Sequence, residues 1–162
     1  MKAKPIIAYF LLACIVFSSA CSTRSSPEEA LQRFYATTDV PEENLMDPLI
    51  VAGKSVVPLV LENIRKKEMP RRRYAIAFLG NGAYPEALPI LESILKDSTE
   101  KDIFRGDALQ AICQINNPLC SQYAAQYKAE SNFLGDVAKQ ILLGADFSKQ
   151  RRSYFAAWLA EL

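Results

Sequence analysis

Cysteine is the residue type in this chain whose placement most directly suggests chemistry. Cys113 and Cys120 flank the segment QINNPL, which is expected to form the turn between two antiparallel helices. Two thiols at the ends of such a turn can come within disulfide range, and in an exported protein such a pair tends to oxidise. Two buried free thiols are the alternative. A metal site is disfavoured, because two cysteines without histidine do not complete a closed zinc shell.

Other catalytic chemistry finds little support in the sequence. Histidine, the commonest general base and metal ligand, is absent. A Gly-rich phosphate loop, a nucleophile elbow and a metal-spaced cluster are also missing. The acidic residues that a carboxylate pair would need are scattered along the chain: Glu42, Glu43, Asp47, Glu62, Asp97 and Asp102. We therefore predict a protein that is not an enzyme and takes no cofactor, metal or small-molecule substrate.

The first residues have the three parts of a secretory signal peptide. Lys2 and Lys4 give a positive start, a continuous apolar run follows, and small residues precede Cys21. The run is shorter than the ~20 residues that span a bilayer. Residues 1–20 are therefore predicted to be a signal peptide and residues 21–26 a polar tether.

The motif SSAC, which ends at Cys21, resembles the lipobox of bacterial lipoproteins. This resemblance implies that Cys21 is acylated, for example with palmitate, and becomes the mature N-terminus. Ser18 stands where the family prefers Leu; LLAC, ending at Cys14, matches better locally but would leave too short an apolar run. Ser22 is similar to the residues that sort such proteins to the outer membrane.

We therefore expect a lipid anchor at the periplasmic face of the outer membrane. The alternatives are the outer leaflet of the inner membrane, a plain cleaved signal that yields a secreted protein, and a retained membrane anchor.

Composition indicates one globular domain, because half of the 162 residues are hydrophobic. The net charge is +1 for the whole chain; without Lys2 and Lys4 it is −1, from 17 basic and 18 acidic residues. A nearly neutral mature chain gives no general attraction to nucleic acid.

Apolar residues recur every three and four positions, and strand-like alternation is missing, which predicts an all-α fold of about nine helices. Ser26, Ser55 and Ser131 are the predicted N-caps, Pro48 should bend or split its helix, and Gly53 should end it. The predicted helices are residues 27–37, 41–52, 56–67, 71–80, 86–97, 101–115, 119–130, 132–144 and 148–162.

The predicted helices repeat. The segment 72–79 matches the segment 105–112 in its Arg, Ala and terminal aliphatic residues, and Pro58 matches Pro89 at a similar spacing. Over residues 41–143 these motifs resemble HEAT repeats of the short bacterial type related to phycobilin lyases. The resemblance implies a short right-handed α-solenoid of antiparallel helix pairs.

Such pairs bury their apolar faces only by stacking on one another, so residues 27–162 are taken as one repeat domain. The helices 27–37 and 148–162 would cap its two ends.

Two further segments are candidate sites for a partner or for lipid. The first is basic and comprises Arg65, Lys66, Lys67, Arg71, Arg72 and Arg73. It would bind an anionic surface; the alternative is a solvated loop between repeats, in which Arg72 and Arg105 contact helix ends or carboxylates. The second is the aromatic stripe of Tyr154, Phe155 and Trp158, which would dock a partner or a membrane, or else cover the last repeat.

A stacked-helix surface offers a large contact area without chemistry, so the predicted function is a non-catalytic scaffold for protein–protein interaction. Its partner would be an unidentified envelope protein, for which this chain serves as an accessory or assembly factor. The alternatives are an immunity-type lipoprotein that blocks a toxin and a module that binds anionic lipid.

Overall fold

Helices make up all the regular structure of residues 25–115 and 117–147, the parts of the chain that the computed structural model describes. Within these residues there is no strand, so the predicted all-α fold is confirmed for them. The α-helices are α1 (Pro27–Ala36), α2 (Asp47–Ala52), α3 (Val57–Asn63), α4 (Arg72–Asn81), α5 (Leu88–Lys96), α6 (Asp102–Ile115), α7 (Asn117–Tyr127) and α8 (Phe133–Leu142). Three short 3₁₀ helices join them: η2 (Glu42–Asn44), η3 (Gly53–Val56) and η4 (Pro85–Ala87).

The predicted helix starts are right where the cap and the proline agree. Ser26 caps α1, since its hydroxyl oxygen accepts a hydrogen bond from the Glu29 amide at 3.1 Å, with Pro27 in the first turn. The predicted N-cap Ser131 is wrong by one position, because the side chain of Asn132 caps α8. Ser55 caps no helix: it lies inside η3, and its hydroxyl donates to the Ala52 carbonyl.

A proline splits the predicted helix 41–52, and a glycine ends it. Pro48 lies in the first turn of α2, where its missing amide N–H costs little. The predicted single helix is therefore replaced by η2 followed along the chain by the short α2. Gly53 follows with φ of 60°, a left-handed conformation that suits glycine. The predicted end of α2 at Gly53 is therefore confirmed.

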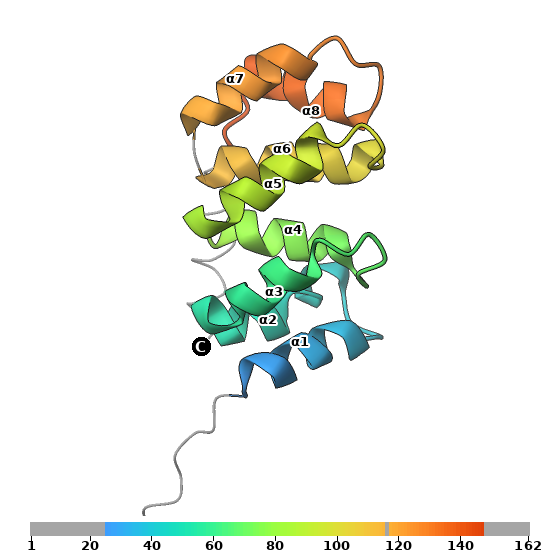
Figure 1. Ribbon diagram of the computed structural model, residues 1–162, viewed down its shortest axis with the longest axis vertical. Coiled ribbons are helices and arrows are strands. Elements are labelled where there is room, and N and C mark those ends of the chain that lie inside the picture. Colours follow the sequence, from blue (N-terminus) through green and yellow to red (C-terminus); the bar gives the residue numbers. More distant parts are fainter. Residues whose placement is uncertain (1–24, 116, 148–162) are drawn as a thin grey trace, which may run out of the picture.

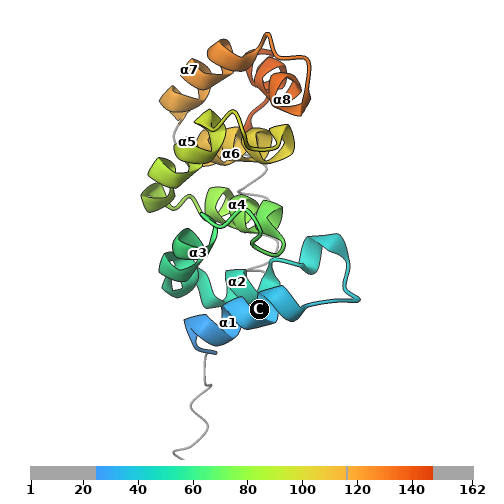
Figure 2. The same cartoon turned by 45° about the vertical axis from the view of Figure 1, so that its right-hand side comes forward.

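The helices are arranged in chain order along the longest axis of the molecule, from α1 at one end to α7 and α8 at the other (Figure 1). Figure 2 shows the same order from another side. Contacts agree with the pictures, because α6 packs against α4, α5, α7 and α8, and α1 packs against α2 and α3. Each helix therefore contacts helices that are close to it in the sequence.

Equivalent positions of successive helices build one continuous core. Ile64 at the end of α3 and Leu95 near the end of α5 are fully buried, and they are separated by the same spacing as Pro58 and Pro89. Ala75 and Ala108 are fully buried in α4 and α6. A Cβ atom built on Gly80 would lie 2.7 Å from the Cα atom of α6 residue Ala111, so small residues let α4 and α6 approach closely.

Candidate functional site

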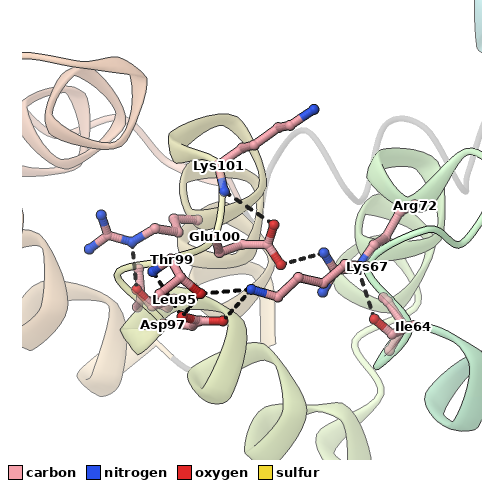
Figure 3. A network of polar contacts seen from close by, with 9 residues as sticks. Ile64, Lys67, Arg72, Leu95, Asp97, Thr99, Glu100 and Lys101 are labelled. Carbon is pink, nitrogen blue, oxygen red and sulfur yellow. Dashed lines mark hydrogen bonds and ion pairs between the residues drawn. The ribbon is translucent and has the colours of Figure 1, made fainter.

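The basic segment 64–73 is mostly used by the fold itself. Arg72, the second residue after Pro70, is buried at the start of α4 with 4% of its surface exposed. Its Nε donates to the Ile64 carbonyl at 2.8 Å, and its Nη1 forms an ion pair with Glu100 (Figure 3). The guanidinium also lies over the ring of Phe104, 5.2 Å from the centroid. Arg72 therefore connects the end of α3, the loop before α6, and α6 itself.

Arg105 of α6 makes similar contacts, except that its aromatic ring comes from the helix before its carboxylate and not from the helix after it. Its Nε donates to the Leu95 carbonyl at 3.0 Å, its Nη2 pairs with Glu130 at 3.2 Å, and the guanidinium lies 5.4 Å from the ring centroid of Tyr127. We call this set of contacts an arginine joint: a guanidinium, a carbonyl at the end of the preceding helix, a carboxylate from the loop before a later helix, and an aromatic ring. The alternative interpretation of Arg72 and Arg105, that they contact helix ends and carboxylates, is confirmed.

Lys67 also contacts a distant part of the chain, the loop between α5 and α6. Its ammonium group donates to Asp97 and to the Thr99 hydroxyl, both at 2.8 Å (Figure 3). Asp97 also accepts from the Thr99 amide at 2.9 Å. Lys67, together with the hydroxyl and the backbone amide of Thr99, holds the pKa of the Asp97 carboxyl well below its usual range.

Arg71 and Arg73 have partners as well. Arg71 has a left-handed backbone with φ of 55°, and its Nη1 donates to the Phe34 carbonyl of α1 at 2.8 Å. Arg73 of α4 pairs with Asp107 of α6 at 2.7 Å. Burial raises the pKa of Asp107, while the hydrogen bond from Arg73 acts in the opposite direction.

Arg65 and Lys66 are the exposed remainder of the basic segment. Lys66 donates to the Asn63 side chain at 3.0 Å. Arg65, but not Lys66, lines a cavity of about 120 Å³ that carries both signs of charge; its other lining residues are Lys67, Arg72, Asp97, Glu100, Ser93 and two isoleucines. Its carboxylates already neutralise most of its cations, so it is a poor site for an anion. The prediction that all six basic residues serve a partner is corrected for Arg72, which is buried, and stays a prediction for the rest.

The cysteine pair lies where the sequence predicted it. Cys113 near the end of α6 and Cys120 in α7 bring their sulfur atoms to 2.07 Å, so the prediction of a pair within disulfide range is confirmed. Both residues are buried. They line a cavity of about 290 Å³ together with Ile141 and Phe147.

Four of the scattered acidic residues accept hydrogen bonds, namely Glu42 from Tyr74, Asp47 from Asn44, Asp97 from Lys67 and Asp102 from the Phe133 amide. Glu92 accepts from Lys96 and from the Tyr123 hydroxyl, both at 2.7 Å, and these bonds lower the pKa of its carboxyl. The ion pair of Glu92 and Lys96 was predictable from the sequence, because the two residues are four positions apart on α5. The hydrogen bond from Tyr123 of α7 was not predictable from spacing. Within the described ranges, no three metal-binding side chains come together.

An exposed apolar pair at the end of α8 was also missed. Leu142 has 46% and Leu143 has 88% of its surface exposed. Together with Lys128, Ala129 and Lys139 they line a shallow groove of about 530 Å³.

The predictions for Cys21, for the signal peptide, and for Tyr154, Phe155 and Trp158 concern residues outside the described ranges. Among the described helices, none combines the length and the apolar character that crossing a bilayer requires.

Comparison with known proteins yields no relative: no family model, no curated protein and no solved structure matches the chain.

Proposed function

We propose that this chain is a non-catalytic scaffold of the bacterial cell envelope. It is a short right-handed α-solenoid of the HEAT-like type, tethered by lipid at Cys21 to the periplasmic face of the outer membrane. There it holds an envelope protein as an accessory or assembly factor.

The repeated arginine joint is the observation that carries this proposal. Arg72 and Arg105 occupy matching positions of successive repeats, and each binds the helix before it and a loop after it. A joint of this kind supports a fold in which similar pairs stack in chain order, as repeat proteins do. Repeat stacks present long surfaces, and such surfaces suit the binding of another protein.

The polar contacts between repeats favour a scaffold over an enzyme. Charged side chains that could do chemistry are paired across helices, as Arg73 is with Asp107 and Lys67 with Asp97. Pairs of this kind fix one helix against the next. They also weaken the alternative of a lipid-binding module, because only Arg65 and Lys66 of the basic segment remain as exposed cations for which the described structure gives no contact to another repeat.

The partner is tested by affinity purification of the full chain from detergent-solubilised envelopes after chemical cross-linking. One envelope subunit recovered in stoichiometric amount supports the proposal, whereas recovery of a toxin domain supports the immunity alternative. Salt-sensitive binding to vesicles of phosphatidylglycerol that is lost in the R65E/K66E variant supports the lipid module. Arg65 and Lys66 are replaced, and Arg72 is not, because Arg72 is buried and its replacement would report on folding and not on binding.

The anchor is tested separately with the two cysteines of the leader region. A C21S variant should leave the membrane fraction and lack an acylated N-terminal peptide in mass spectrometry. The C14S variant is the matched control and should remain anchored. Retention of both variants in the membrane would refute acylation at Cys21.

A further inference from the structure

The end of α8 lacks a cover that its counterpart in the preceding repeat has. Residues 106–113 (GDALQAIC) in α6 align with residues 135–142 (GDVAKQIL) in α8, which places Leu142 over Cys113. Cys113 has only 7% of its surface exposed and is bonded to Cys120 of α7. Leu142 is a larger apolar residue and is 46% exposed. A helix that does for α8 what α7 does for α6 is therefore missing from the described residues.

The residues that follow have the pattern of such a helix. In α5 the buried apolar residues occur at positions i, i+1, i+4 and i+5: Ile90, Leu91, Ile94 and Leu95. The same spacing recurs beyond Phe147 in Tyr154, Phe155, Trp158 and Leu159.

We infer that residues 148–162 dock on the exposed end of α8 and cover Leu142 and Leu143. The inference rests on the proposed repeat of helix pairs, but not on the proposed partner or anchor. Phe147, the last described residue, is buried and lines the cavity at the disulfide together with Ile141, the residue before Leu142, so the described chain ends against the C-terminal part of α8. This attachment gives the segment an effective concentration that a separate molecule does not have.

The consequence concerns how a partner is bound. A docked segment turns Tyr154, Phe155 and Trp158 toward α8, so they are not offered to a partner or a membrane. A partner must then use the sides of the stack instead of its C-terminal end.

Site-specific photo-crosslinking of the full chain in its own envelope tests the inference. A benzophenone amino acid replaces Leu142, and in a matched control it replaces Val51 of α2, which is similarly exposed at 51%. Mass spectrometry should find the cross-link from position 142 within residues 148–162 of the same chain, and no such link from position 51. Cross-links from position 142 only to lipid, to a second copy or to another protein would overturn the inference.

Limited proteolysis gives an independent measurement. Trypsin cleaves after Lys149, Arg151 and Arg152, and cleavage should follow the fraction of molecules in which the segment is undocked. The L142D variant should be cut about tenfold faster than the wild type, and V51D at the wild-type rate. Equal rates in the wild type and L142D would overturn the inference, because they mean that Leu142 holds nothing in place.

Discussion

Replacing Arg72 by Met should destabilise the protein far more than the same change at Arg105, although both residues form an arginine joint. The side chains of Arg72 and Glu100 are 3% and 4% exposed, whereas those of Arg105 and Glu130 are 12% and 31% exposed. Removing one partner of a buried ion pair leaves an uncompensated charge and costs about 3–5 kcal/mol. The more exposed pair is screened by water, and we expect its loss to cost about 1 kcal/mol.

The assay is urea unfolding followed by circular dichroism at low temperature, with the R105M variant as the matched control. Domains of this size have about 5–15 kcal/mol of stability, so R72M can fail to fold; E100Q then replaces it, since it leaves the arginine charge unpaired in the same place. The R72M/E100L double variant should recover much of the loss, because no charge then remains buried. A cost below about 1 kcal/mol for R72M would refute the buried joint.

Three further predictions use the same assay. Replacing both Cys113 and Cys120 by Ser should cost about 2–3 kcal/mol, from the entropy of the short loop that they close, and reduction of the wild type should have the same effect. The pKa of Asp97 is depressed in the folded state by Lys67 and Thr99. The stabilising contribution of Asp97 is therefore present above the ordinary aspartate pKa of about 3.9 and is lost as the pH falls below it. The D97N variant should flatten the acid side of the stability–pH curve, and an unchanged curve would contradict this. A G80A substitution should cost about 1–3 kcal/mol by forcing α4 away from α6, and a wild-type unfolding midpoint would show that the two helices can separate freely.

The helices were predictable because their signals are local. Periodic apolar residues, Pro27 with Ser26, and Gly53 gave the helix type and several boundaries correctly. The errors came where two candidates compete within one turn: Asn132 displaces Ser131 as a cap because its side chain reaches the Gly135 amide. Such choices depend on backbone angles that the sequence pattern does not specify.

The candidate sites were harder to predict because their contacts join residues that are far apart in the sequence. The six basic residues form one cluster in the sequence, yet the fold sends Arg72 to Glu100, Arg73 to Asp107 and Lys67 to Asp97. The sequence match between segments 72–79 and 105–112 did anticipate that Arg72 and Arg105 act alike, since each binds a carbonyl at the end of the preceding helix and a carboxylate further along the chain. The disulfide was predictable for a different reason, since its two cysteines have a sequence separation of only 7.

The arginine joint has a consequence for how this architecture changes length. Each joint takes its groups from one short window of the chain, from Ile64 to Phe104 in the first case and from Leu95 to Glu130 in the second. A tandem duplication of one such window would therefore bring both halves of its own connection with it. Insertion or deletion of one such window would therefore change the length of the protein without requiring any new type of contact between its helices.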